Sequence, residues 1–519
     1  MTPRLTARER YQTLSIKREP FLRRAREASK YTIPSLVPPD GFNGTQDLTQ
    51  PWQSLGARCV NNLAAALNLA LLPPTRRPFR LRLTSKIRSQ IADDQYGEWE
   101  EALARYEQRI SEDIESSGTR VQINEALKHL QVAGTVALYY GPSATRVFPL
   151  YQFVCRRAPE GDVQEIIVVE LISEEQIPES IRPQVIKGKA ARTSSTEKTF
   201  ELYTVVERDG EVFQQYQELE GVRVPDSEGV WQADDCPWSV PRWIRIDGED
   251  YGRGHVEEHL GDLKTFEGLS RSITIAAGAA AKVIFMAKPS GMTNVDDLVA
   301  AESGDFVEGD KEDVGVLGLE KFGDFQIAKD VMQGIQVSLA ASFLLNSALR
   351  RDAERVTAEE IRMLIQELEN SLGGVWSIMT IELLLPMIRS RMATMQRTKK
   401  VPTLPKGTAE PVVVTGVDAL GRANELQRLD SFVQRIATAL GPQAVPQFLN
   451  VTEYLKRAAA AEDIEPKGLI KTEEQISAET QQANQMALAQ KAAGPAIKLA
   501  GDIAAQKHQF QAADGKLPS

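Results

Sequence analysis

Residues 251–263 read YGRGHVEEHLGDL, and at this stretch the character of the chain changes. Between about residues 134 and 246, β-branched and aromatic runs are separated by Gly, Pro and charged clusters, a pattern typical of antiparallel strands. From residue 255 to about residue 285 the sequence predicts one helical run, about 45 Å long at 1.5 Å per residue. We therefore predict an α+β protein that is mainly α-helical, and the lack of strand–helix alternation disfavours a doubly wound fold.

Within this stretch, His255, Glu258 and His259 form the pattern H-x-x-E-H, which inverted zinc peptidases use for two metal ligands and a general base. On a helix the two histidines face the same direction and could share a zinc ion, although a third ligand would have to come from elsewhere. The alternative is structural, because Gly252 and Gly254 open a helix whose N-terminal dipole favours nearby acids. We expect the structural role and no metal, with a zinc-dependent hydrolase as the alternative.

The composition excludes several classes of protein. The chain has 519 residues, a net charge of −10 and 42% apolar residues, so it is a folded protein of several lobes without the basic excess of a permanent nucleic-acid binder. Three widely spaced cysteines predict neither a disulfide framework nor a cysteine zinc site. The chain contains no P-loop, and we expect no cofactor. Its most apolar run, residues 273–287, covers about half a membrane span and contains Lys282, so we expect no membrane segment.

Helical patterns precede the strand region. Helices are predicted up to about residue 31, around the apolar repeat Leu63, Leu67, Ala70 and Leu71, and over about residues 93–116 and 121–132. The predicted strands are TVALYY (135–140), IIVVELI (166–172), FELYTVV (200–206), EVFQQYQ (211–217) and RWIRI (242–246).

Helical patterns also follow the strand region. The run after residue 255 carries very small side chains in IAAGAAAK, which suit tight packing between helices, and a second helix resumes near residue 325. Thr357 and Glu360 form a capping box at the start of a long helix, with a kink expected at Gly373-Gly374 or at Pro386. Further helices are predicted at about 419–440 and 443–461, followed by a tail rich in Ala and Gln.

Residues 296–324 form an acidic insert that contains ten acidic residues and only two lysines. Taken alone, such a segment is typical of a solvated loop with short strands. Another charged segment, NSALRRDAERV at 346–356, interrupts two helical runs with Arg350, Arg351 and Arg355. It is either an exposed turn or, if the helices line a pore, the place where arginines meet whatever passes through.

Short motifs along residues 30–400 resemble the portal, or head-to-tail connector, proteins of short-tailed bacteriophages of the podovirus and autographivirus type. The motifs are YTIPSL (31–36), PWQSLGAR (51–58), NNLA (61–64), DGEDYGR (247–253), EEHLGDL (257–263), GDFV (304–307), LEK (319–321), NSA (346–348), ERVTAEEIR (354–362) and LGGV (372–375). They occur in the family's order, and the match is loose beyond about residue 420. The resemblance in the opening stretch does not depend on either histidine.

The resemblance implies a non-enzymatic protein with the portal fold, which assembles into a ring of twelve subunits around a DNA channel. The implied parts are a wing of N-terminal helices and antiparallel β region (1–254), a first stem helix (255–288), a clip (289–324), a second stem helix (325–346), a tunnel loop (347–356), a long wing helix with linker (357–418), and crown helices with a C-terminal tail (419–519). The ring would lie at one capsid vertex of the virion, after assembly in the host cytoplasm.

The resemblance also implies two sets of functional residues. The tunnel loop would face DNA through Asn346, Ser347, Leu349, Arg350, Arg351, Asp352, Glu354 and Arg355. The clip would dock partners through Asp296, Asp297, Glu302, Asp305, Glu308, Asp310, Glu312 and Asp313. The implied partners are double-stranded DNA, the major capsid protein, the scaffolding protein, the terminase large subunit, a tail adaptor and internal core proteins. A ring or scaffold component without a DNA channel is the second alternative.

Overall fold

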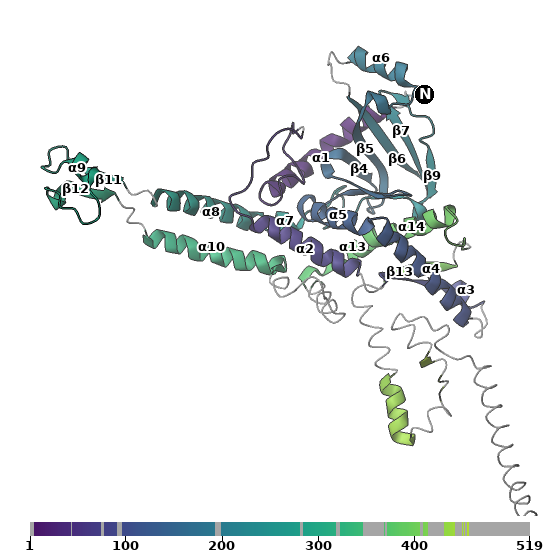
Figure 1. Ribbon diagram of the computed structural model, residues 1–519. Coiled ribbons are helices and arrows are strands. Elements are labelled where there is room, and N and C mark those ends of the chain that lie inside the picture. The colour runs from purple at the N-terminus through teal and green to yellow at the C-terminus, as the bar shows by residue number, and fades with distance from the viewer. Residues whose placement is uncertain are drawn as a thin grey trace, which may run out of the picture. The chain divides into compact units, whose positions relative to one another are not determined.

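The structure is a computed structural model in which helices dominate and antiparallel sheets fill much of the remainder, as the sequence predicts (Figure 1). It describes residues 5–42, 44–73, 77–90, 96–192, 199–280, 284–317, 322–345, 368, 371–404, 408–413, 430–441, 449, 451 and 454–455. The chain divides into two compact units, Met1–Val417 and Asp418–Ser519.

Four long helices open the larger unit and confirm the helical predictions for this region. They are α1 (Ala7–Lys30), α2 (Leu55–Leu71), α4 (Tyr96–Ser116) and α5 (Thr119–Ala133), with the short α3 (Ser85–Arg88) ahead of α4. Helix α1 begins with a capping box in which Glu9 N donates to Thr6 Oγ1 and Thr6 N donates to Glu9 Oε2. The apolar repeat that predicted α2 is buried at all four positions.

The largest sheet among the described residues has six antiparallel strands in the order β4-β5-β6-β7-β8, with β9 also paired to β7. Its strands are β4 (Phe153–Arg157), β5 (Val163–Ser173), β6 (Thr199–Asp209), β7 (Val212–Leu219), β8 (Val222–Arg223) and β9 (Gly229–Gln232), and helix α6 (Arg182–Arg192) lies between β5 and β6 in the sequence. Strands β2 (Ala137–Tyr140), β3 (Thr145–Phe148) and β10 (Trp238–Ser239) form a small sheet, and β1 (Phe79–Leu83) pairs with β13 (Ala409–Val413).

Four of the five predicted strand runs are confirmed, and the fifth, RWIRI at 242–246, is wrong. This stretch makes only isolated bridges, between Thr135 and Arg242 and between Ile244 and Arg253. Pro241 has no amide donor for a ladder, and Arg242 N donates to Glu382 Oε2 at 3.0 Å instead of to a strand. The β propensity of the side chains is therefore outweighed by a tertiary hydrogen bond.

Helix α1 is attached to the large sheet through buried polar contacts. Ala7 N donates to Glu218 Oε1 at 2.9 Å, and Arg10 pairs with Glu165. Arg18, which is buried, donates from Nη1 to the carbonyl oxygen of Phe153 at 2.9 Å. Because a buried guanidinium needs acceptors for its donors, these contacts fix α1 across the sheet.

Two antiparallel helices, together named the stem, follow the hinge at residues 251–259 (Figure 1). The first begins as α7 (His255–Glu258) and continues as α8 (Leu260–Ala280), and the second is α10 (Phe322–Ser342). Ser270 of α8 lies 3.6 Å from the Met332 sulfur of α10, whereas His255 at the start of α7 contacts Ser342 at the end of α10. The two helices therefore run in opposite directions.

The predicted helix at 255–288 is too long at its C-terminal end. Strand β11 (Ile284–Ala287) pairs with β12 (Val314–Leu317), so the last part of the predicted first stem helix belongs to a hairpin. Ile284 and Phe285 favour a strand, and the long-range pairing decides between two structures that the local sequence allows. The acidic insert between these strands contains the short helix α9 (Val295–Ala300). Residues 284–317 are hereafter named the clip module.

The second stem helix begins three residues before the predicted start at residue 325, and α10 ends at Ser342 rather than at 346. Residues 346–350 lie outside the described part of the chain. At the end of α10, Asn62 Nδ2 of α2 donates to the carbonyl oxygens of Phe343 and Leu344, at 3.1 and 3.0 Å. This contact supplies a partner for carbonyl groups that a helix terminus leaves unpaired.

The long helix predicted from residue 357 is interrupted in the part that the structure describes. Gly373 has φ +45°, and α13 (Gly374–Met379) begins after it. A π-helical turn over Thr380–Leu384 then leads into α14 (Leu385–Arg397), whose second residue is Pro386. Both predicted kink positions are therefore irregular: Gly373 has a positive φ, and a π-helical turn precedes Pro386. Proline lacks the amide donor that a regular helix needs, and a π turn accommodates the missing hydrogen bond. The capping box at Thr357 and Glu360 lies outside the described residues.

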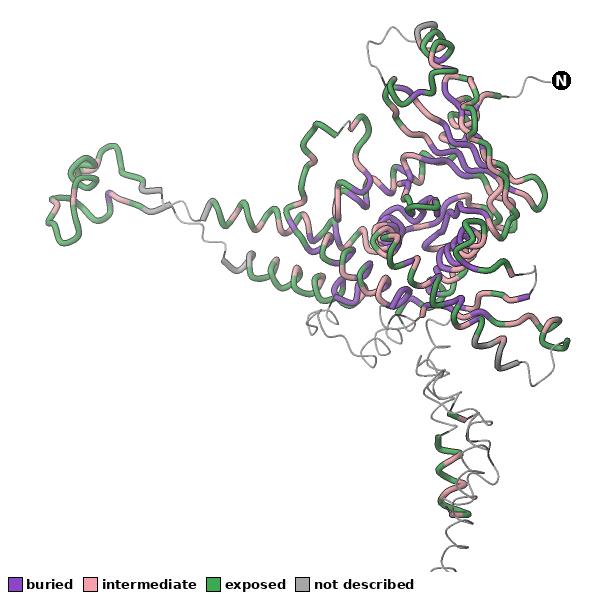
Figure 2. The backbone as a smooth tube through the Cα atoms, turned by 45° about the vertical axis from the view of Figure 1, so that its right-hand side comes forward, coloured by how far each residue is buried: buried purple, intermediate pink, exposed green. Residues whose placement is uncertain are grey.

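Burial is concentrated in the large sheet and the helices around it, whereas the stem and clip module are largely exposed (Figure 2). Of the smaller unit, the structure describes a helix over residues 430–440, and Tyr454 Oη donates to Asp430 Oδ1 at 2.7 Å. In the described part of the chain, no helix is both long and apolar enough to cross a membrane.

We predict that Gly134→Ala destabilises the larger unit by about 1–2 kcal/mol from its positive φ of 77°, and by about 1–3 kcal/mol more from crowding. A Cβ at this position would lie 2.4 Å from the Gly252 carbonyl oxygen. Gly210→Ala is the matched control, because Gly210 also has a positive φ but has open space around it. Urea denaturation of both variants measures the difference, and equal losses would contradict the crowding.

Candidate functional site

The hinge at residues 251–259 is held by backbone-to-backbone contact. A Cβ at Gly252 would lie 2.5 Å from the Gly134 carbonyl oxygen, and a Cβ at Gly254 would lie 2.6 Å from that of Gln131. Only glycine fits at such distances, so both glycines allow the hinge to pass close to the end of α5. Tyr251 is buried, and its hydroxyl accepts a hydrogen bond from Cys155 N at 2.9 Å. The structural interpretation of the opening stretch agrees with this packing.

Charged contacts tie the hinge to α1. Arg253 pairs with Glu249 at 2.7 Å and with Glu257 at 3.0 Å, and Arg24 of α1 lies 3.2 Å from the same Glu257. The hydrogen bond from Arg253 lowers the pKa of the Glu249 carboxyl and keeps it ionised. These groups are partly exposed, so the ion pairs add little to the free energy of unfolding. Their main effect is to orient the stem relative to α1.

The H-x-x-E-H residues do come together in space. His255 Nδ1 lies 3.4 Å from Glu258 Oε2, and the His255 and His259 ring centroids are 4.9 Å apart. The ligand atoms of the three residues lie within 4.8 Å of one another. His255 is buried between the rings of Trp243 and Phe343, at 5.5 and 4.7 Å, and its Nε2 lies 3.2 Å from the Ser342 carbonyl oxygen. Burial, together with His259, lowers the pKa of His255, so its ring is neutral near pH 7.

Among the described residues, the stem exposes four large apolar side chains. They are Ile275 of α8 and Ile327, Val331 and Val337 of α10. At 3.6 residues per turn, the three α10 residues fall within about 120° of the helix surface, on the side away from Leu339. We name this set the stem apolar strip.

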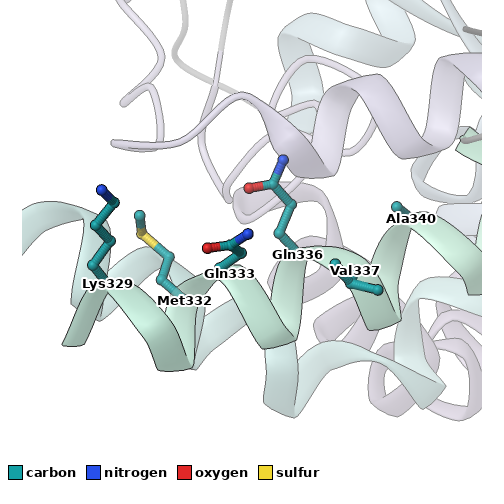
Figure 3. Close-up of a pocket in the computed structure, with 6 residues that line it drawn as sticks. All are labelled: Lys329, Met332, Gln333, Gln336, Val337 and Ala340. Carbon is teal, nitrogen blue, oxygen red and sulfur yellow. The ribbon is translucent and has the colours of Figure 1, made fainter. Parts of the chain in front are cut away.

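A hollow of about 360 Å³ lies beside this strip along α10 (Figure 3). Its lining residues are Lys329, Met332, Gln333, Gln336, Val337 and Ala340. Every one of them belongs to α10, so the hollow is a surface groove on one helix rather than an enclosed cavity. Its mixed amide, amine and apolar lining fits another protein surface better than it fits a reacting small molecule.

The clip module places seven of its eight predicted docking acids on the surface. The exposed acids are Asp296, Asp297, Glu302, Asp305, Glu308, Asp310 and Glu312. Asp313 differs, because it is buried and its Oδ2 accepts from Met292 N at 2.8 Å and from Thr293 Oγ1 at 3.2 Å. Asp313 therefore organises the turn beneath the surface, and its own oxygens are not presented to a partner.

The clip module also exposes apolar residues, which the prediction from its acids did not include. Met292, Val299 and Phe306 are almost entirely exposed, with Phe306 as exposed as in an extended chain. A phenylalanine between acidic residues in a segment without a helical or strand period was the available signal. Aromatic and methionine side chains are enriched in protein interfaces.

The predicted tunnel loop lies outside the described residues. This holds for all eight of its predicted site residues: Asn346, Ser347, Leu349, Arg350, Arg351, Asp352, Glu354 and Arg355. Its role stays a prediction. The described chain on its N-terminal side ends at Leu345, directly after the α10 terminus that contacts Asn62 and His255.

Comparison with known proteins gives consistent matches over most of the chain. The sequence profile of a family described as "Bacteriophage head to tail connecting protein" matches residues 4–470. The chain is 38% identical to the portal protein of Escherichia phage T7 over 520 residues, covering 98% of this chain and 96% of that protein. It is 38% identical to the portal protein of Enterobacteria phage T3 over 91% of this chain and 89% of that protein. The portal protein of Pseudomonas phage phiKMV is 30% identical over 91% and 93% of the two chains.

We predict that Asp313→Ala loosens the turn at residues 291–293 by about 1–3 kcal/mol, because the Met292 amide and the Thr293 hydroxyl, both in part-buried hydrogen bonds, lose their charged acceptor. Faster amide hydrogen exchange of Met292 and Thr293 measures this loss. Glu308→Ala removes an exposed acid of the same module and serves as the control. Unchanged exchange in Asp313→Ala would show that the carboxylate does not hold the turn.

Proposed function

The chain belongs to the bacteriophage head-to-tail connecting protein family, whose curated members are portal proteins, and from this membership we propose that its subunits close into a ring around a DNA channel. Portal proteins are structural, so the chain is not an enzyme and the zinc-dependent hydrolase alternative is wrong. The proposed ring has twelve subunits, as the resemblance implies, and lies at one vertex of the phage capsid.

The stem apolar strip is the observation that carries this proposal. An antiparallel helix pair that exposes isoleucine and valine on the face away from its own core needs a further surface to cover them. Ring assembly supplies that surface, since a heterologous contact repeated by rotation closes on itself. The groove beside Val337 offers the neighbouring subunit a place to insert a side chain.

A channel for packaging and ejection must guide DNA without binding it tightly. Every phosphate that a cation neutralises adds salt-dependent affinity, so a strongly basic wall would hold the duplex in place. The chain has a net charge of −10, and Arg350, Arg351 and Arg355 are concentrated in one short segment. Repeated around a ring, these arginines would form one narrow basic band in an otherwise acidic protein. This distribution fits a duplex that is centred and still slides.

The clip module is the proposed docking surface for the terminase large subunit during packaging and for the tail adaptor afterwards. Seven exposed acids steer a basic partner surface, while Met292, Val299 and Phe306 supply apolar contact area. The major capsid protein, scaffolding protein and internal core proteins complete the proposed set of partners. We propose that the ring assembles in the host cytoplasm and remains in the virion.

We predict that Val337→Asp prevents ring closure, because a carboxylate would be buried against the neighbouring stem at every subunit contact. Negative-stain microscopy and light scattering of the purified full chain distinguish rings from monomers. Val121→Asp is the matched control, because it introduces the same charge at an exposed valine near the start of α5. A wild-type protein that stays monomeric would overturn the ring, and intact rings of Val337→Asp would remove the stem strip from the subunit contact.

We predict that the double change Arg350→Ala and Arg351→Ala leaves rings intact and reduces the packaging or retention of DNA in phage heads. The physical reason is the loss of two cations per subunit from the proposed constriction. Arg208→Ala with Arg223→Ala removes the same charge from the large sheet and serves as the control. Heads that fill normally with the first pair changed would favour the alternative of a ring component without a DNA channel.

A further inference from the structure

We propose that His255, Glu258 and His259 bind one divalent transition-metal ion, with zinc as the best fit, in a structural role that braces the hinge at the base of the stem. The proposal does not depend on the ring or on DNA. The family resemblance does not depend on either histidine of this site, and the proposed role involves no catalysis. The geometry of the three side chains, the burial of His255 and the contact to Ser342 point to it independently.

The spacing of the three side chains fits a metal site. The three residues lie on one helical turn at positions i, i+3 and i+4, and their ligand atoms lie within 4.8 Å of one another. Tetrahedral zinc with bonds of about 2.0–2.2 Å requires ligand atoms about 3.4 Å apart. His255 Nδ1 and Glu258 Oε2 already lie at 3.4 Å. Only His259 needs to turn inward, and it is partly exposed, so its ring can move without disturbing the core.

The tautomer of His255 also suits a metal ligand. Its Nε2 lies 3.2 Å from the Ser342 carbonyl oxygen, and a carbonyl accepts only from an N–H. The proton is therefore on Nε2, and the lone pair is on Nδ1, which faces Glu258. A histidine that donates one ring N–H to a backbone carbonyl and presents the other nitrogen is the usual arrangement at protein metal sites.

Aromatic groups cover one side of this polar cluster. His255 is only 7% exposed, and the rings of Trp243 and Phe343 pack against it. The apolar wall excludes water from one side of the site, while Glu258 keeps the other side open to solvent. Imidazole and carboxylate ligands suit zinc, nickel and cobalt, and a fourth position would be left for water.

A bound ion would hold the turn at residues 255–259 closed. Because His255 also contacts the end of α10 through Ser342, the same ion would fix the first stem helix against the second. The metal would then act as a brace for the angle at which the stem leaves the hinge. The expected consequence is a rise in the thermal midpoint with metal concentration.

The test is titration of the untagged, metal-stripped full chain with Zn²⁺ by calorimetry and with Co²⁺ by visible absorption. We expect one ion per chain and a d–d spectrum of low-coordinate cobalt. Glu258→Gln and His259→Gln should each weaken binding by about tenfold or more, since even outer-shell partners cost 10–100-fold. Glu258 is exposed, so Glu258→Gln keeps the fold and remains informative even if a histidine variant fails to fold.

His508→Gln removes a histidine far away in the sequence and should leave zinc affinity and the cobalt spectrum unchanged. No binding to the wild-type chain, or equal binding to Glu258→Gln and His259→Gln, would overturn the proposal. Microscopy of the same samples reports ring formation separately. A wild-type chain that forms rings but binds no Zn²⁺ in the titration would disprove the metal site while leaving the proposed function in place.

Discussion

The crossing of two backbone segments at Gly134 and Gly252 is the constraint on which the rest of the structure depends. Gly252 N donates to Thr135 Oγ1 at 2.6 Å, and Trp243 N donates to the Gly134 carbonyl oxygen at 2.9 Å. No side chain can separate the segments at these distances, so the end of α5 and the start of the stem share one rigid junction. The direction of the stem is thus decided where two glycines meet.

Buried charge specifies how the later part of the chain joins this junction. Arg242 is almost fully buried, and its Nη2 and Nε lie 2.5 and 3.2 Å from the Glu382 carboxylate, which belongs to the π-helical turn before α14. Arg391 of α14, also buried, donates to Thr119, Thr145 and the Gly141 carbonyl. Buried ion pairs add little net stability, but leaving one partner alone is costly. Alternative registers of the long helix are therefore penalised.

The sequence predicted elements with a strong period and missed those that long-range contacts decide. The apolar repeat at Leu63 and Leu67 predicted α2. The glycines at the hinge and the small residues that follow predicted the first stem helix. By contrast, the helix continued through Ile284 in the prediction because only pairing with β12 makes that residue a strand. The acids of the clip module were recognised as a group, yet the buried position of Asp313 follows from a turn 20 residues away in sequence. The spatial contact of His255 with Ser342 had no local signal at all.

The exposed apolar face of α10 links stability to assembly. Within the subunit, α10 is held at its C-terminal end by Asn62 and His255, while Ile327 and Val331 nearer its start remain exposed. Most of the stability of a helix in a protein comes from the packing of its apolar face, so covering this exposed face would add to the support that α10 already receives from α8. Binding a neighbour stabilises only the form that presents the strip, so the stem is expected to become rigid as subunits associate. The hinge supplies the direction of the stem, and in the proposed ring the contact with a neighbouring stem would supply its rigidity.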